Sequence, residues 1–308
     1  MPPAVPGAHA VGMTYRFSVV IPCYNEEAYV GDAIRSLQAQ EFDGAYEIVV
    51  VDNNCTDGTA EIARGLGVRV VTEAVPGVCN ARQTGTEASS GEIVISADAD
   101  TTYAPDWLAK IDRGFRVGGD VVAVVGPCRY ADGPRWGQVF ARALFGAVGL
   151  VYRATGRPYY VTATNIAFRR DRWEGYDLRL SQGGDELDLL RRMRRQGRVV
   201  YDRTNPTFTS GRRFTRGFVY NVFVSLFLFY LSAYVVNRMF GRRVVGGSPA
   251  FRDSRATPSR RRFRVVAAGL VSGLALFAFQ APRAYVAHTA DTVANYVHRY
   301  PVGGDVRW

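Results

Sequence analysis

The stretch Glu92-Ile93-Val94-Ile95-Ser96-Ala97-Asp98-Ala99-Asp100 predicts a short buried strand that ends in two carboxylates one residue apart. Side chains at alternate positions of an extended segment point the same way, so we expect Asp98 and Asp100 to converge. Two carboxylates this close repel each other unless a positive charge lies between them. Mg²⁺ uses few protein carboxylates and completes its shell with water and phosphate oxygens. The stretch therefore indicates a metal-assisted site for a phosphorylated substrate, although an isolated Asp-x-Asp is often only a solvated turn.

Outward from this strand, residues 17 to about 200 alternate between short β-branched runs and amphipathic segments. We predict strands at residues 17–21, 47–51, 68–72, 93–97, 121–125, 162–169 and 198–201. We predict helices at residues 29–40, 59–66, 78–88, 105–117, 137–152 and 185–196. Near-continuous apolar strands separated by helices of this length are typical of an α/β fold, with a mostly parallel sheet covered by helices on both faces.

The 308-residue chain has a formal net charge of +10, and 47% of its residues are hydrophobic. The charge is uneven, because residues 238–264 contain nine arginines and a single acid. These arginines flank long apolar runs, so we expect an anionic membrane surface as partner and no nucleic acid. The four cysteines show no Cys-x-x-Cys spacing, and no signal peptide is recognisable, so we expect reduced cysteines and a catalytic part in the cytoplasm.

Polar motifs follow the predicted strands at the edge of the sheet where α/β proteins bind their ligands. The first strand ends in Ile21-Pro22-Cys23-Tyr24-Asn25-Glu26. The second ends in Val51-Asp52-Asn53-Asn54-Cys55-Thr56-Asp57-Gly58-Thr59, in which we expect Asp57 to cap the next helix. No Gly-x-Gly-x-x-Gly follows the first strand, so a dinucleotide-dependent oxidoreductase is disfavoured.

Taken in order, these two motifs and Asp98-Ala99-Asp100 resemble those of the family 2 glycosyltransferases of the GT-A fold. The resemblance covers residues 17–217, about two thirds of the chain. It implies a Rossmann-like GT-A domain that binds a UDP- or GDP-sugar and uses Mg²⁺ or Mn²⁺.

The resemblance also implies roles for single residues. Asp52 would hydrogen-bond the base or ribose, and Arg82 would face the same base. Asp98 would approach the ribose or sugar and, with Asp100, would hold the cation that neutralises charge on the departing nucleoside diphosphate. The turn that cradles the nucleotide would consist of Pro22, Tyr24, Asn25 and Glu26.

Two further segments resemble motifs of the family. Asp185-Glu186 resembles an acid pair at a helix start, which supplies the catalytic base in an inverting transfer; a helix N-terminus stabilises such a carboxylate. The usual order is Glu then Asp, so by position Glu186 is the base, whereas by residue type Asp185 could be; of the two we favour Glu186. Acidic residues also occur in the first turn of a helix solely because they interact favourably with the helix dipole. Arg212 and Arg213 resemble arginines that clamp the diphosphate, and a basic cluster beside a membrane is an equally good interpretation of them.

Past residue 216 the composition changes. Residues 218–236 and 265–281 are uncharged apolar runs, separated by the basic segment 237–264. The first run is long enough to span a bilayer and the second is borderline. Spanning would place nine arginines outside, against the positive-inside tendency, so we favour helices lying shallowly in the cytoplasmic face of the cell membrane. We therefore predict three parts: a flexible tail (1–15), a GT-A domain (16–216) and a helical membrane-associated region (217–308).

The leading hypothesis is an inverting, metal-dependent glycosyltransferase that acts on a hydroxyl of a lipid-linked or glycan acceptor at the membrane. A polyprenyl-phosphate sugar synthase is the main alternative, although a phosphate acceptor needs no base and the acid pair argues mildly for a hydroxyl. A nucleotide-sugar-binding scaffold without turnover is a third interpretation. A nucleotidyltransferase is disfavoured because no glycine-rich, lysine-bearing phosphate loop is present.

Overall fold

The computed structural model describes residues 15–178, 180 and 184–217. The predicted tail, except for its last residue, lies outside the described residues, as do the apolar runs 218–236 and 265–281 and the basic segment between them. Within the described ranges, no helix is both long and apolar enough to cross a membrane. The expectations for the C-terminal region therefore remain predictions.

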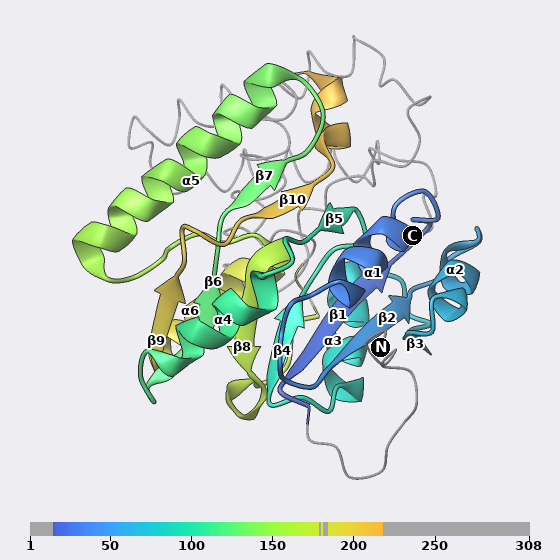
Figure 1. Cartoon of the computed structure of the whole chain (residues 1–308), viewed down its shortest axis with the longest axis horizontal. Helices are drawn as coiled ribbons and strands as arrows, with labels where there is room; N and C mark the ends of the chain where they lie inside the picture. Colours follow the sequence, from blue (N-terminus) through green and yellow to red (C-terminus); the bar gives the residue numbers. More distant parts are fainter. Residues whose placement is uncertain (1–14, 179, 181–183, 218–308) are drawn as a thin grey trace, which may run out of the picture. The chain divides into compact units, whose positions relative to one another are not determined.

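A seven-stranded sheet forms the centre of the described part (Figure 1). Its strands are β1 (Phe17–Cys23), β2 (Tyr46–Asp52), β3 (Arg69–Thr72), β4 (Ile93–Ser96), β6 (Val121–Val125), β8 (Ile166–Arg169) and β9 (Arg198–Tyr201). They lie in the order β3-β2-β1-β4-β8-β6-β9. All pairings are parallel except the two that β8 makes with β4 and β6. The predicted α/β architecture with a mostly parallel sheet is confirmed.

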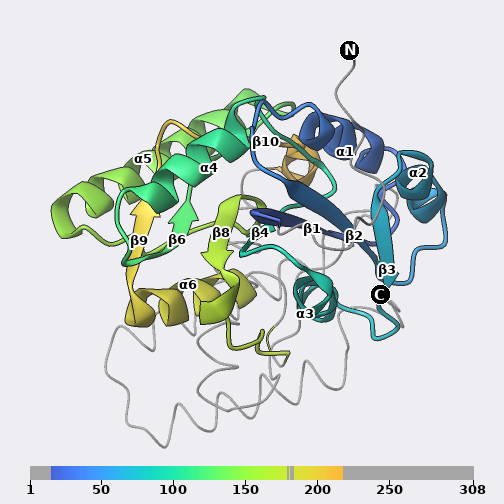
Figure 2. The same ribbon diagram turned by 60° about the horizontal axis from the view of Figure 1, so that its bottom comes forward.

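Helices cover both faces of this sheet. They are α1 (Val30–Gln38), α2 (Thr59–Gly65), α3 (Val78–Ala88), α4 (Trp107–Arg116), α5 (Arg135–Thr155) and α6 (Asp185–Gln196). Figure 2 shows α1, α2, α4 and α5 on one face, and α3 and α6 on the other. Each lies where the sequence predicts a helix, because apolar residues recur at helical spacing on the side that faces the strands.

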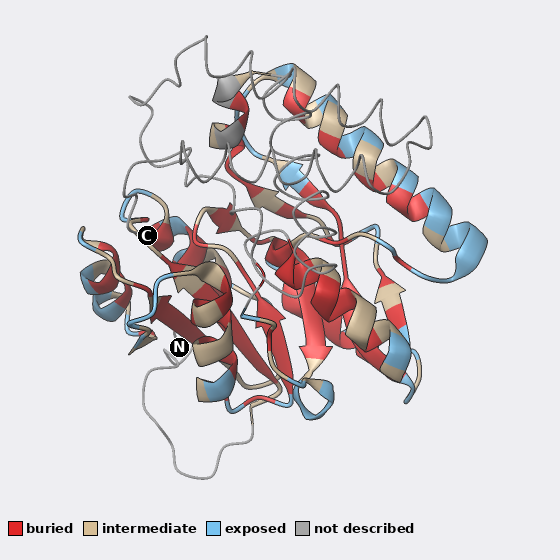
Figure 3. Ribbon diagram, turned by 180° about the vertical axis from the view of Figure 1, so that it is seen from behind, coloured by how far each residue is buried: buried red, intermediate tan, exposed pale blue. Residues whose placement is uncertain are grey.

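Two apolar layers hold these helices to the sheet (Figure 3). On one face, Phe17 and Ile95 pack with Trp107, whose side chain is fully buried. On the other face, Phe168 packs with Leu189 of α6. Burial of each such side chain contributes about 1.5–3 kcal/mol, so the strand ends are carried by a well-packed scaffold.

One predicted strand is too long. The segment predicted at 162–169 divides into a 3₁₀ turn (Ala163–Asn165) and the shorter strand β8. The cause is the buried Asn165 side chain, whose Nδ2 donates to the carbonyls of Pro127 and Asn205 and whose Oδ1 accepts from the Trp107 indole. These long-range bonds hold the backbone of this residue out of the sheet.

A second, three-stranded sheet lies beside the carboxyl ends of the main strands, and the sequence did not predict it. Its strands are β5 (Thr101–Thr102), β7 (Cys128–Tyr130) and β10 (Thr207–Thr209), in the order β5-β10-β7. The backbone N–H of Ser210 donates to the carbonyl of Asp100 at 2.9 Å, which joins the end of β10 to the predicted metal-binding motif. This sheet thus brings residues more than one hundred positions downstream to the candidate site.

Candidate active site

The predicted motifs meet at the carboxyl ends of β1, β2 and β4. Cys23 and Asp52 are register partners at the ends of β1 and β2, and Val20 of β1 is opposite Ser96, the last residue of β4. Parallel neighbours end at the same edge of a sheet, so the three following loops share one region.

Hydrogen bonds between the loops fix the end of this region formed by β1 and β2. The Asn25 Oδ1 accepts from the backbone N–H of Thr56 at 2.7 Å, joining the two loops. The Asp52 Oδ1 accepts from the backbone N–H of Cys55 at 2.9 Å, so this residue also shapes its own turn. Asp57 accepts from the N–H of Thr59, the first residue of α2, although Gly58 and not Asp57 is at the N-cap position of that helix.

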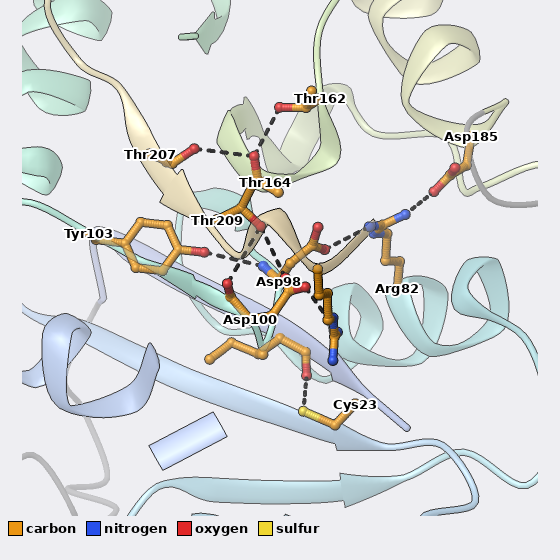
Figure 4. Close-up of polar contacts among 12 residues, drawn as sticks. Cys23, Arg82, Asp98, Asp100, Tyr103, Thr162, Thr164, Asp185, Thr207 and Thr209 are labelled. Carbon is orange, nitrogen blue, oxygen red and sulfur yellow. Dashed lines mark hydrogen bonds and ion pairs between the residues drawn. The ribbon is translucent and has the colours of Figure 1, made fainter. Parts of the chain in front are cut away.

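Asp98 and Asp100 lie side by side, and each carboxylate is held by an arginine (Figure 4). The Asp98 Oδ1 lies 3.0 Å from Arg82 Nη2, and the Asp100 Oδ2 lies 2.9 Å from Arg212 Nη2. The Asp100 Oδ1 also accepts from the Thr209 hydroxyl at 3.2 Å. The predicted convergence of the two aspartates is thus present, with a guanidinium at each.

Arg212 connects the loop after β1 to the Asp-x-Asp motif. Its Nη2 lies 2.7 Å from Glu26 Oε1 as well as 2.9 Å from Asp100 Oδ2, and its guanidinium stacks over the Tyr29 ring at 4.6 Å. Arg212 follows the small sheet, in a 3₁₀ helix (Gly211–Arg216) that Ser210 caps. The Arg212 guanidinium therefore bridges two carboxylates. The family resemblance assigns one of them, Glu26, to nucleotide binding and the other, Asp100, to metal binding.

Arg82, on α3, connects Asp98 to the acid pair of α6. Its Nη2 donates to Asp98, and its Nη1 forms a very short ion pair with Asp185 Oδ2. Burial acts to lower the pKa of the Arg82 guanidinium, but the carboxylates of Asp185 and Asp98 outweigh it and hold that pKa well above its usual value. Arg82 is therefore a fixed positive charge between the metal-binding motif and the predicted base.

The two residues of the acid pair differ in their electrostatics. Burial acts to raise the pKa of Asp185, but the Arg82 guanidinium outweighs burial and the net pKa is lowered. Burial, followed by the Asp185 carboxylate, raises the pKa of Glu186 well above its usual value. Asp185 is therefore the ionised member of the pair, and Glu186 holds the proton.

The donor set fits a divalent cation. In the part of the chain that the structure describes, Asp98 and Asp185 pair with Arg82, and Glu26 and Asp100 pair with Arg212, so four carboxylates lie in two neighbouring clusters. Carboxylate oxygens are the hard donors that Mg²⁺ and Mn²⁺ prefer. No cluster of three or more His, Cys, Asp or Glu side chains in the described part has the arrangement of a metal site. A Mg²⁺ site needs only one or two carboxylates when substrate phosphates complete the shell.

The predicted site residues therefore fall into two groups. Glu26, Asp100 and Arg212 form one ion-pair cluster, and Asp98, Asp185 and Arg82 form a second; the two meet at the Asp-x-Asp motif and are together called the acidic network. The others adjoin this network: Asp52 and Asn25 shape the loops, Pro22 lies in β1, Tyr24 follows that strand, and Glu186 is next to Asp185. The backbone of Arg213 lies in the 3₁₀ helix next to Arg212.

Two residues of the network were not predicted from the sequence. Thr209 donates its hydroxyl to Asp100, and the Tyr103 hydroxyl accepts from the backbone N–H of Asp98 at 3.2 Å. Burial raises the pKa of Tyr103 well above its usual value, which keeps this hydroxyl neutral. The only sequence signal for Tyr103 is its place three residues after Asp100, and Thr209 has no local signal at all.

Residues 18–174, about half of the chain, match the model of the family described as glycosyl transferase family 2. The chain belongs to this family. It is therefore a glycosyltransferase, as the order of its motifs predicts. An uncharacterized glycosyltransferase of Mycobacterium tuberculosis is 33% identical over 175 residues, which cover 53% of this chain and 76% of that protein.

Other family 2 relatives match over shorter segments. An undecaprenyl-phosphate 4-deoxy-4-formamido-L-arabinose transferase of Pseudomonas aeruginosa is 34% identical over 117 residues, 35% of this chain and 34% of that protein. Among solved structures, glucosyl-3-phosphoglycerate synthase from M. tuberculosis with Mn²⁺, UDP-glucose and phosphoglyceric acid has a TM-score of 0.51 at 23% identity, covering 76% of this chain and 81% of that one. At this identity the likeness shows the GT-A fold, as predicted.

Proposed function

We propose that this glycosyltransferase moves a sugar, with inversion, from a UDP- or GDP-sugar to a hydroxyl of a membrane-associated lipid-linked or glycan acceptor. The observation that carries the proposal is the acidic network at one strand edge, in which Asp98, Asp100 and Asp185 surround two arginines. Its carboxylate oxygens suit a divalent cation, and its arginines suit a diphosphate.

Asp100 and Asp98 are the residues that would hold Mg²⁺ or Mn²⁺. When bound there, the cation would neutralise the charge that builds on the departing nucleoside diphosphate. Arg212 is close enough to assist, because its guanidinium already lies at Asp100 and at the nucleotide-facing loop after β1. We propose that this guanidinium turns from Asp100 to the diphosphate when donor binds, with Arg213 beside it in the chain.

We propose Asp185 rather than Glu186 as the base that deprotonates the acceptor hydroxyl. A base must be ionised, and Arg82 keeps the pKa of Asp185 low while burial keeps the pKa of Glu186 high. Asp185 is also one guanidinium away from Asp98, which would lie against the donor. In this chain the usual Glu-Asp order is reversed, and the aspartate, Asp185, is the acid that we propose to be ionised.

The identity of the acceptor is the main alternative. The undecaprenyl-phosphate transferase of P. aeruginosa suggests a polyprenyl phosphate. A phosphate acceptor is already an anion and needs no base, so Asp185→Asn would abolish transfer to a hydroxyl but spare transfer to a polyprenyl phosphate. Both acceptors belong at a membrane, and nucleotide sugars are cytoplasmic, so we propose the cytoplasmic face of the cell membrane as the site of action.

The decisive experiment measures hydrolysis of UDP- and GDP-sugars by the full chain with Mn²⁺ and with EDTA. We expect hydrolysis of one donor with Mn²⁺, a loss of at least tenfold with EDTA, and a similar loss in Asp100→Asn at subsaturating Mn²⁺. The UDP-glucose complex of the structural neighbour makes UDP-sugars the first donors to try. Metal-independent hydrolysis would contradict the proposed cation, and binding of a donor without turnover would favour the scaffold.

A further inference from the structure

A cavity lined by four arginines lies away from the candidate active site. It has a volume of about 400 Å³, and its basic lining residues are Arg157, Arg194, Arg195 and Arg198. Arg157 follows the end of α5, Arg194 and Arg195 are in the last turn of α6, and Arg198 begins β9. Because β9 starts here, the cavity is at the amino end of that strand, whereas the acidic network is at the carboxyl ends of β1, β2 and β4.

Most of this positive charge has no acidic partner among the described residues. Of the four cavity arginines, Arg198 alone has such a partner there, Asp120, at 3.0 Å. Arg194 stacks its guanidinium over the Tyr159 ring at 4.1 Å, while its buried Nε has no hydrogen-bond partner. The dipole of α6 explains cations in its last turn, but it does not explain why Arg157 and Arg198 line the same cavity. Converging arginines with donors to spare are typical of a phosphate site.

Exposed apolar side chains lie next to these arginines in the chain. Leu150 and Val151, in the C-terminal half of α5, are 62% and 43% exposed, and Tyr159 is 52% exposed. Figure 3 shows that end of α5 largely in the colour of exposed residues. Large apolar side chains at this exposure are unfavourable in water but suit the boundary between lipid headgroups and acyl chains. A soluble phosphate compound would gain nothing from them.

We propose that this arginine cavity binds the phosphate of an anionic lipid while Leu150, Val151 and Tyr159 enter the membrane interface. The charge complementarity is direct, because three guanidinium groups without an acidic partner in the described part of the chain would meet a headgroup phosphate. Its residues are other than those of the basic segment 237–264, so the proposal gives the catalytic domain a membrane contact of its own.

The test is calorimetric titration of the full chain with water-soluble dihexanoyl phosphatidylglycerol below its aggregation concentration. The double variant Arg157→Gln/Arg195→Gln removes two cavity arginines. Its matched control, Arg64→Gln/Arg172→Gln, removes the same charge from exposed positions on α2 and in the 3₁₀ turn after β8. Residues 237–264 are unchanged in all proteins, so they cancel in the comparison. We expect at least tenfold weaker binding in the cavity variant and a change below twofold in the control.

Three further arms identify the ligand. Dihexanoyl phosphatidylcholine should bind at least tenfold more weakly than phosphatidylglycerol, and so should glycerol 3-phosphate, which lacks acyl chains. The variant Leu150→Ser/Val151→Ser should bind the lipid more weakly but should bind glycerol 3-phosphate with unchanged affinity. Equal binding by the cavity variant and the wild type would overturn the site. Equal binding of glycerol 3-phosphate and the lipid would overturn the lipid assignment. If the double variant shows no melting transition and is therefore unfolded, the single variant Arg195→Gln, which changes an exposed residue, is compared with the wild type in the same lipid titration.

Discussion

The Arg212 guanidinium lies at Asp100, so a metal ion that binds Asp100 would have to displace it. This guanidinium lies 2.9 Å from Asp100 and 2.7 Å from Glu26, and the side chains of both acids are at most 10% exposed. The variant Arg212→Ala removes the positive charge that lies between Glu26 and Asp100. A Mn²⁺ ion at Asp100 then no longer displaces a guanidinium, and it enters a more negative site.

The size of the effect follows from Coulomb's law. Two unit charges about 4 Å apart interact with about 1 kcal/mol in water and about 4 kcal/mol at an effective dielectric constant of about 20, and a divalent ion doubles these energies. Because the Arg212 side chain is partly exposed, the figure for water, about 2 kcal/mol for Mn²⁺, is the better guide. We therefore expect the nucleotide-free variant to bind Mn²⁺ about thirtyfold more tightly. We expect it to bind UDP in the presence of saturating Mn²⁺ at least tenfold more weakly, because the diphosphate loses its clamp.

The assay is electron paramagnetic resonance of free Mn²⁺ during titration of the protein without nucleotide. Arg35→Ala, which removes an exposed arginine paired with Asp32, is the charge-matched control and should leave Mn²⁺ affinity unchanged. Unchanged or weaker Mn²⁺ binding by Arg212→Ala would refute the placement of the cation at Asp100. Stronger Mn²⁺ binding without weaker UDP binding would refute the diphosphate role of Arg212 and leave the metal site intact.

Three further predictions concern the scaffold and the acid pair. Gly85→Ala should lower the free energy of unfolding by about 1–3 kcal/mol in urea titrations, because an added Cβ would collide with Val20 where α3 packs on β1; an unchanged midpoint would contradict that packing. The pKa of Glu186 is raised in the folded protein, so the folded chain keeps this proton at pH values where the unfolded chain has lost it. The free energy of unfolding therefore falls as the pH rises above the ordinary pKa of a glutamate. Glu186→Gln should therefore gain melting temperature relative to wild type between pH 5 and pH 8, and a loss would show that the folded carboxyl is ionised. Asn165→Ala should cost about 2–4 kcal/mol, because the Trp107 indole and two buried carbonyls lose their partner; a cost below 0.5 kcal/mol by the same titration, roughly the size of a surface change, would mean that water replaces it.

The sequence determined most of the scaffold because the scaffold is built from local patterns. Long apolar runs such as that of β4, and helices with one apolar face such as α6, are visible in a single stretch of residues. The order of motifs at the strand ends was equally local, and it identified the family. The two aspartates of the Asp-x-Asp motif lie side by side as predicted. Both follow the end of β4 at Ser96, however, and Asp100 lies in a turn, so the two-residue period of a strand is not what brings them together.

Tertiary structure alone decided which charges face one another. Strands of two or three residues are too short for a periodic signal, so the small sheet, and with it the contact between Arg212 and Asp100, arises from long-range backbone pairing. The sequence likewise left two candidates for the base and favoured Glu186 by its position, whereas we propose Asp185. The ion pair with Arg82 distinguishes them, because a buried carboxyl stays ionised only where a cation more than one hundred residues away in the chain is packed against it.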